Sequence, residues 1–228
     1  HAEDVRAAIA RHEGWPEEGI VLSPGSNLLV LALAEAAGSV LDTAPAFPYY
    51  AGAARAAATP RRAVPLGPGF ALPLAALLDE LDRAPGVLFL PNPHGPTGAL
   101  FAAADVAALA AKAREREALL VVDEAYHAFA GSDARPIARG NPCVAILRTF
   151  SKSWCLGGIR AGYLLASPEV AAVARAIGLG DCFEDVQRDA IGAQRRILGH
   201  HHHVVEEAVH GLLERRQRHE HAGVFALG

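Results

Sequence analysis

Short apolar runs rich in Val, Ile and Leu alternate with Ala-rich stretches along most of this chain, and that alternation limits the possible folds more than any other feature. Each run is bounded by Gly, Pro, Asn or Asp, a pattern that is typical of buried strands. We predict strands at residues 20–23, 39–43, 62–66, 87–90, 119–123, 144–150 and 162–166.

The stretches between these runs favour helices, because Ala and Leu are strong helix formers. We predict helices at residues 2–13, 27–37, 48–58, 74–82, 101–117 and 168–177, and over most of 185–220. Strands and helices therefore alternate throughout the region up to residue 166. This order predicts an α/β fold: a three-layer αβα sandwich with a mostly parallel sheet of about seven strands and a ligand site at the carboxyl ends of the strands.

The pattern becomes wholly helical after residue 166, and this change divides the chain. We expect residues 1–183 to form a ligand-binding large domain. Residues 184–228 are expected to form a long helix and the start of a small domain that is largely missing. The chain begins with His1 and contains no Met, which favours a fragment or a processed chain.

The composition argues against several classes of protein. The chain has 21 Lys and Arg residues against 25 Asp and Glu, and its net charge of −4 argues against a nucleic-acid binder held by bulk charge. The longest apolar run, Leu28 to Ala34, is far shorter than the roughly 20 residues that span a bilayer, so we predict no membrane helix. Three cysteines without a CxxC pair favour a reducing, cytoplasmic compartment.

A run of histidines, His200 to His203, falls within a predicted helix. Successive helical residues point in different directions, so these side chains do not converge easily on one tetrahedral ion. We interpret the run as a solvated helix face and predict no metal site.

Two glycine-containing turns follow predicted strands. In Ser23 to Asn27, Gly25 permits a tight turn, and the backbone N–H groups around Ser26 and Asn27 would open the next helix as an anion site for a phosphate. An ordinary turn with a helix cap is the competing interpretation. In Pro91 to Gly98, prolines and glycines predict a rigid loop whose backbone approaches a ligand, or a structural turn.

A carboxylate and an amine end two further strands. Asp123, in the segment VVDEAY, should have a cationic or N–H partner, because an unpaired buried charge is very costly; a helix cap is the alternative. Lys152 is flanked by Phe150 and Trp154, so we expect it to be partly desolvated and usable as a nucleophile for a Schiff base. Arg160 follows within reach of an anion held beside that amine.

Taken together, these signals specify an aromatic pyridinium that carries a phosphate arm and an aldehyde, which describes pyridoxal 5′-phosphate. Lys152 would bind the aldehyde, Asp123 the ring nitrogen and Tyr126 the phenolic oxygen. We predict that the cofactor phosphate and its surroundings are bound by Gly25, Ser26, Asn27, Thr149, Ser151 and Arg160.

The order of these motifs resembles the fold-type I pyridoxal-phosphate enzymes, and within them the class I/II aminotransferases, most of all the histidinol-phosphate aminotransferases. VVDEAY and the stretch Ser151 to Tyr163 carry the resemblance. It implies that Phe47, in APAFPYY, lies against the cofactor ring. The family loop reads NPxNPTG, and Gly95 stands here in place of its second Asn, which binds the phenolic oxygen.

The resemblance implies an enzyme that exchanges an amino group between an amino acid, or an amino-alcohol phosphate, and a 2-oxo acid. Lys152 would act as general base, and Asp123 would keep the ring nitrogen protonated. A homodimer is implied for the complete protein. Two alternatives stay open: a related decarboxylase of amino-acid phosphates, and a non-catalytic aminotransferase-like binding domain.

Overall fold

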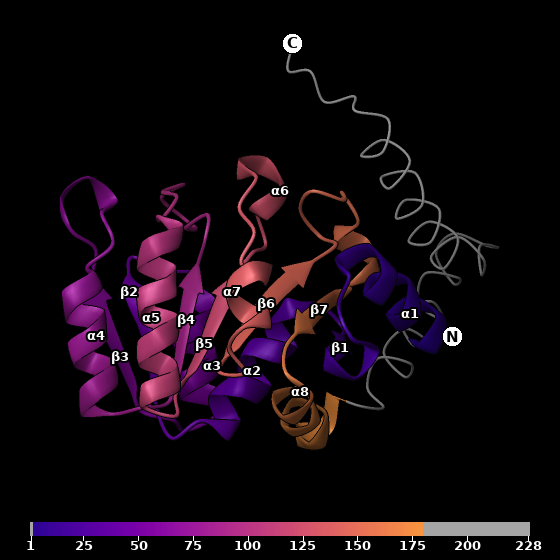
Figure 1. The fold of residues 1–228 in the computed structure, drawn as a ribbon, viewed down its shortest axis with the longest axis horizontal. Coiled ribbons are helices and arrows are strands. Elements are labelled where there is room, and N and C mark those ends of the chain that lie inside the picture. Colours follow the sequence, from indigo (N-terminus) through magenta and orange to yellow (C-terminus); the bar gives the residue numbers. More distant parts are fainter. Residues whose placement is uncertain (1, 180–228) are drawn as a thin grey trace, which may run out of the picture.

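The computed structural model describes residues 2–179 and contains one seven-stranded sheet (Figure 1). The strands are ordered β1-β7-β6-β5-β4-β2-β3 across the sheet. Their bounds are β1 (Ile20–Ser23), β2 (Val40–Ala44), β3 (Arg61–Pro65), β4 (Val87–Pro91), β5 (Leu119–Asp123), β6 (Val144–Thr149) and β7 (Gly162–Leu165). The predicted strands are confirmed, and each boundary differs by at most one residue from the prediction.

The sheet is parallel except at β7, which runs antiparallel to both of its neighbours, β1 and β6. The prediction that strand and helix alternate throughout is wrong at this point. Between β6 and β7 lies only a short 3-10 turn, Gly157–Ile159. Parallel neighbours need a long crossover, usually a helix, so a direct reversal produces an antiparallel pair.

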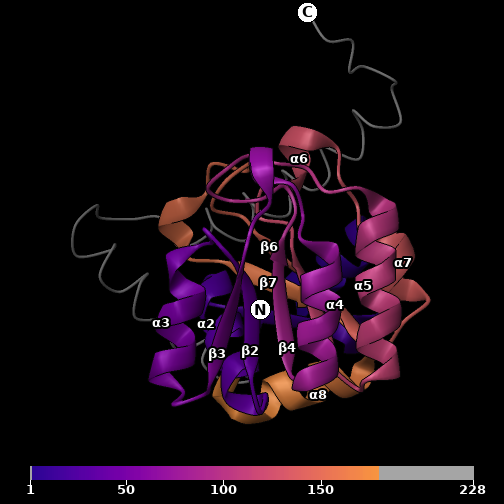
Figure 2. The same cartoon turned by 90° about the vertical axis from the view of Figure 1, so that its left-hand side faces the viewer.

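Helices cover both faces of the sheet, which confirms the three-layer sandwich. Figure 2 shows the two helical layers on opposite sides of the strands. One face is covered by α1 (Ala2–Glu13), α4 (Leu74–Arg83), α5 (Ala103–Glu115) and α7 (Arg135–Arg139). The other is covered by α2 (Ser26–Ala36), α3 (Pro48–Ala56) and α8 (Pro168–Ala174).

The central strands are apolar on both faces, as strands of a covered parallel sheet must be. Along β5, Leu120 and Val122 join the core beneath α4 and α5, whereas Val121 joins the core beneath α2 and α3. A polar side chain at the end of such a strand is therefore an exception that needs an explanation.

The predicted helices up to residue 117 are confirmed, with ends that differ by at most two residues. The helix predicted at 168–177 is α8, followed by a π-helical turn over Arg175–Leu179. Two short helices, α6 (His127–Ala130) and α7, were not predicted. No helix among residues 2–179 is both long and apolar enough to span a membrane. The helix predicted at 185–220, the domain boundary at 183 and the histidine run lie outside the described residues.

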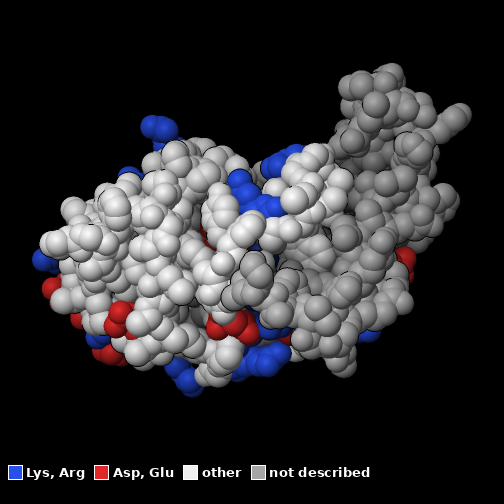
Figure 3. Space-filling view, turned by 90° about the horizontal axis from the view of Figure 1, so that it is seen from above, with Lys and Arg blue, Asp and Glu red and all other residues white. Residues whose placement is uncertain are grey.

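Strands β1, β2, β4, β5 and β6 all run in one direction, so their carboxyl ends meet at one edge of the sheet. Residues at this edge come from segments far apart in the sequence. Figure 3 views the molecule from the side of this edge and shows basic side chains gathered beside a hollow.

Candidate functional site

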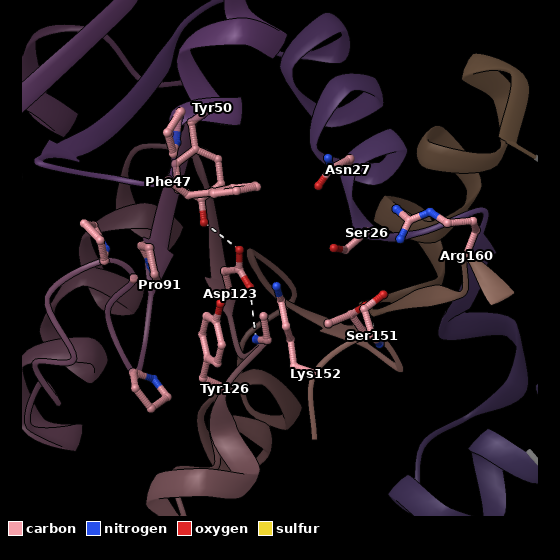
Figure 4. A pocket seen from close by; sticks show the side chains of 16 residues that line it. Ser26, Asn27, Phe47, Tyr50, Pro91, Asp123, Tyr126, Ser151, Lys152 and Arg160 are labelled. Carbon is pink, nitrogen blue, oxygen red and sulfur yellow. Dashed lines mark hydrogen bonds between the residues drawn. The ribbon is translucent and has the colours of Figure 1, made fainter. Parts of the chain in front are cut away.

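A cavity of about 310 Å³ lies at the carboxyl edge of the sheet. Its volume is at the lower end of the range for small-molecule sites. All of the predicted site residues except Gly25 line it, together with residues of two proline-rich turns. The lining consists of Ser26, Asn27, Phe47, Pro48, Tyr50, Pro91, Pro93, Gly95, Pro96, Asp123, Ala125, Tyr126, Thr149, Ser151, Lys152 and Arg160 (Figure 4).

Asp123 ends β5 at the floor of the cavity, and two donors hold its carboxylate. The Tyr50 hydroxyl donates to Oδ2 at 2.6 Å, and the Ala125 backbone N–H donates to Oδ1 at 3.0 Å (Figure 4). The expected N–H partner is therefore present. The second partner is a buried phenol that the sequence analysis did not assign.

Burial raises the pKa of Asp123 above its ordinary value. The hydrogen bonds from Tyr50 and Ala125, and the charge of Lys152, act in the opposite direction on that pKa without cancelling the effect of burial. A buried carboxylate in this condition is stabilised by a cation, because charge pairing offsets the loss of hydration. The floor of the cavity is thus a site for a positively charged group.

Lys152 stands beside Asp123 and Tyr126. Its Nζ lies 5.5 Å from the centroid of the Tyr126 ring, and Figure 4 shows the side chain extending toward Asp123. The predicted partial desolvation of Lys152 is wrong, because the side chain is exposed. Phe150 and Trp154 pack against each other, with ring centroids 5.7 Å apart, and join the core instead of covering the amine.

The beginning of α2 and Arg160 form a cradle for an anion. Gly25 precedes α2 with φ of 82°, and within residues 2–179 no side-chain hydrogen bond caps the first turn of the helix. A Cβ on Gly25 would lie 2.6 Å from the Nη2 atom of Arg160, so only glycine lets the guanidinium approach the backbone here. Similarly, a Cβ on Gly162 would lie 2.6 Å from the Ser26 backbone nitrogen. Free helical N–H groups beside a guanidinium are typical of phosphate sites.

Thr149 and Ser151 shape the turn that leads to Lys152. The Thr149 hydroxyl donates to the Ala161 carbonyl at 3.3 Å, and its Oγ1 accepts from the Ser151 N–H at 3.1 Å. The Thr149 hydroxyl therefore makes its hydrogen bonds within the turn. Ser151 is left half-buried in the cavity wall with its hydroxyl beside the cradle (Figure 4).

Phe47 forms an aromatic wall of the cavity. It lies at the N-cap position of α3, and 40% of its surface is exposed. Its ring packs edge-on against Tyr50, whose own ring stacks on Phe89 at a centroid distance of 5.0 Å. Tyr50 lies three positions after Phe47 within the same segment, and this helical spacing is the signal that could have identified it.

Gly95 lies against Tyr126 on the opposite wall. A Cβ on Gly95 would stand 3.6 Å from the Cε2 atom of Tyr126, an ordinary contact distance. The position therefore accepts a side chain next to the phenol, as the NPxNPTG pattern requires.

Comparison with known proteins agrees with this geometry. The family model described as aminotransferase class I and II matches residues 1–219. The histidinol-phosphate aminotransferase of Deinococcus radiodurans is 44% identical over 175 residues, which cover 75% of this chain and 48% of that protein. The chain spans about half the length of the curated relatives it matches.

Solved structures share the fold. The histidinol-phosphate aminotransferase of Sinorhizobium meliloti, in complex with pyridoxal-5′-phosphate, superimposes with a TM-score of 0.69 at 28% identity, covering 95% of this chain and 59% of that one. That of Clostridium acetobutylicum superimposes with a TM-score of 0.73 at 20% identity, covering 96% and 65%.

Proposed function

Because this chain belongs to the class I and II aminotransferase family, we propose that its cavity binds pyridoxal phosphate for amino-group transfer. The complete protein would exchange an amino group between an amino acid, or an amino-alcohol phosphate, and a 2-oxo acid. One observation carries the proposal: an amine, a buried carboxylate and an anion cradle face a single cavity, as Lys152, Asp123 and Arg160 do here.

The residues of the cavity fit this cofactor in chemistry and in arrangement. Its phosphate matches the cradle at Gly25 and Arg160, where a Cβ would close the space that the guanidinium fills. Its aldehyde requires a primary amine, which Lys152 supplies. Its ring nitrogen requires the carboxylate of Asp123, and its planar ring matches the exposed face of Phe47.

When bound, pyridoxal phosphate supplies an electron sink for the electron pair released at the substrate Cα. Lys152 would hold the cofactor by its aldehyde. When the substrate amine takes its place, the Nζ atom of Lys152 would serve as the general base that accepts the proton from the substrate Cα. The exposure of the Lys152 residue suits this exchange, because the substrate must reach the same aldehyde carbon.

Asp123 keeps the ring nitrogen protonated. Burial raises the pKa of this carboxyl, because removal from water disfavours its ionised form. A pyridinium N–H supplies a cationic partner, so binding and protonation reinforce each other. Tyr50 and Ala125 fix the orientation of the carboxylate for this contact.

Tyr126 is proposed to bind the phenolic oxygen of the cofactor. Its side chain lines the cavity next to Lys152 and is 39% exposed. With glycine at position 95, Tyr126 would act without the amide donor that the resemblance expects there. We propose that cofactor binding survives this departure, since the other contacts are present.

The named relatives support histidinol phosphate, an amino-alcohol phosphate, as the amino donor and thus favour transfer over decarboxylation. We further propose that the complete protein is a homodimer in a reducing, cytoplasmic compartment. The division of the chain at residue 183 into a cofactor-binding domain and the start of a small domain is proposed on the sequence pattern.

A half-reaction assay tests the proposed function. The chain loaded with pyridoxal phosphate is mixed with histidinol phosphate or with glutamate, and the visible spectrum and the oxo product are followed. We expect the visible absorption band of the bound cofactor to be lost. Up to one equivalent of oxo product per bound cofactor should form, without carbon dioxide. The chain has two lysines, so Lys152→Ala should abolish the reaction and Lys112→Ala, on α5, should leave it intact.

Other outcomes select the alternatives. Release of carbon dioxide from an amino-acid phosphate would support a decarboxylase. Cofactor binding at Lys152 without any product, in a chain extended to the length of the curated relatives, would support a non-catalytic binding domain.

A further inference from the structure

His94 lies next to the cavity but is not exposed to it. Its side chain is 1% exposed, and both of its ring nitrogens contact threonine hydroxyls. Nε2 lies 2.9 Å from the Thr43 Oγ1 atom, and Nδ1 lies 2.9 Å from the Thr97 Oγ1 atom. The ring edge packs against Phe101 at a centroid distance of 5.5 Å. A buried imidazole with both nitrogens bound in this way is held in one orientation.

The neighbouring hydrogen bonds are compatible with a proton on Nε2. The Thr43 hydroxyl donates to the Pro45 carbonyl at 3.4 Å, so its oxygen is available to accept from Nε2–H. The Thr97 oxygen accepts from the Ala99 N–H at 3.2 Å, so its hydroxyl proton is available to Nδ1. This arrangement satisfies a neutral imidazole completely. Burial lowers the pKa of His94, which favours the same neutral form.

The two threonines lie in the two segments that contribute Phe47 and Gly95 to the walls of the cavity, although neither threonine lines the cavity itself. Thr43 is in β2, and the chain continues from it through Pro45 to Phe47, the aromatic wall. Thr97 belongs to the turn after β4 that contributes Gly95 to the wall beside Tyr126. The imidazole of His94 is thus a cross-link by hydrogen bonds between the two loops.

Backbone contacts fix the turn around the same residue. The His94 N–H donates to the Ala99 carbonyl at 2.7 Å, and the Gly98 N–H donates to the His94 carbonyl at 2.7 Å. The Asn92 side chain closes the turn by accepting from the Phe101 N–H at 2.9 Å. The turn is therefore rigid in itself. The contact between His94 and Thr43 ties it to the segment that leads to Phe47, beyond the point where the pairing of β2 with β4 ends.

We propose that His94 is a positioning residue that sets the spacing between Phe47 and the Gly95 turn, and thereby the fit of the planar cofactor ring. The inference rests on the proposed function, because the ring is that of pyridoxal phosphate. None of His94, Thr43 and Thr97 lines the cavity, so their effect is transmitted through the loops. The proposed effect of His94 is on the fit of the cofactor ring and does not involve the bond between Lys152 and the cofactor aldehyde.

Isosteric variants test this role in the 228-residue chain. Thr43→Val and Thr97→Val each remove one link at constant shape. His94→Phe removes both links but keeps a ring against Phe101, and His94→Gln restores one donor and one acceptor. Pyridoxal phosphate and pyridoxamine phosphate, which has no aldehyde, serve as probes. Their affinities are measured by titration, and the visible circular dichroism of bound pyridoxal phosphate reports the surroundings of its ring.

We expect Thr43→Val to weaken binding of both probes about tenfold, the equivalent of one hydrogen bond. His94→Phe should weaken binding further and change the visible circular dichroism, and His94→Gln should recover most of both. The matched control is Thr59→Val. It removes a hydroxyl donor to the Ala34 carbonyl at 2.9 Å, at the other end of the sheet, and should lower stability without changing affinity.

Two results would overturn the inference, and they are distinguishable. If the unaltered chain binds pyridoxal phosphate at Lys152 while the threonine and His94 variants bind both probes with unchanged affinity, His94 has only a structural role. If the unaltered chain binds neither probe, the proposed function fails and the inference falls with it. Because the threonine variants preserve shape, the test stands even if His94→Phe does not fold.

Discussion

The hydrogen bond from Tyr50 to Asp123 is the contact whose loss has the most direct consequence for the site. Tyr50→Phe removes only the hydroxyl, since the ring keeps its stacking on Phe89, which lies nearly parallel to it at an angle of 7°. The Asp123 carboxylate then retains the Ala125 N–H as its hydrogen-bond donor among the described residues. The substitution therefore isolates one charged hydrogen bond in a buried setting.

The magnitude follows from the geometry. The bond is short, at 2.6 Å, and its acceptor is a buried carboxylate oxygen, so its loss should lower the free energy of unfolding by about 1.5–3 kcal/mol. Removing the donor also raises the pKa of Asp123 beyond the increase that burial already causes. At any pH between the Asp123 pKa of the folded parent and that of the folded variant, the Asp123 carboxyl is more protonated in the variant. The stability difference should therefore shrink as the pH falls through that range.

Urea denaturation of both proteins, repeated from neutral to mildly acidic pH, measures this effect. Tyr49→Phe is the matched control. Tyr49 is the next residue in the sequence, it is half-buried, and its hydroxyl makes no hydrogen bond to the described residues. We expect the control to change stability by less than about 0.5 kcal/mol. A Tyr50→Phe variant that matches the control, or whose deficit is constant with pH, would refute the assignment of Tyr50 as the partner of an ionised Asp123.

Two further substitutions test the cradle and a buried ion cluster in which Arg148 pairs with Glu13 and Glu124. Gly25→Ala should lower the free energy of unfolding by about 1–3 kcal/mol, because φ of 82° is strained for alanine. It should also weaken pyridoxal phosphate binding, because the added Cβ displaces Arg160. Undiminished binding in a titration would argue against the cradle. Arg148→Met should cost about 3–5 kcal/mol at neutral pH, because Arg148 lies 2.6 Å from carboxylate oxygens of both Glu13 and Glu124. Chemical denaturation should show this loss decreasing as these carboxylates become protonated in acid; a pH-independent loss would contradict the charge pairing.

The layers of the fold were predictable because the covered sheet demands apolar strands. Runs such as β4 and β5 are apolar on both faces and stop at a proline or an aspartate, so periodicity and length were sufficient to find them. Helices α6 and α7 were missed because four and five residues are too few to display a helical period. The reversed direction of β7 could not be read from the sequence, since the short connection after β6 looks like any other loop.

The site was predictable to the extent that topology determines it. Polar residues that follow parallel strands must share an edge, so Asp123, Lys152 and the Gly25 turn were expected together. Tyr50 was missed because its hydrophobic ring suits the apolar side of α3 equally well, and only the distance to Asp123 reveals its role. The exposure of Lys152 was missed because Phe150 and Trp154, its neighbours in sequence, turn toward the core.

The most direct test of the central claim, that Lys152 is the amine that holds pyridoxal phosphate, is reduction of the mixture with borohydride followed by peptide mapping. The chain contains two lysines, one on α5 and one in the cavity, so the map separates a specific bond from random modification. We expect the reduced adduct on the peptide that contains Lys152 and none on the peptide that contains Lys112. An adduct shared equally between both lysines, or none in a folded chain, would contradict the assignment.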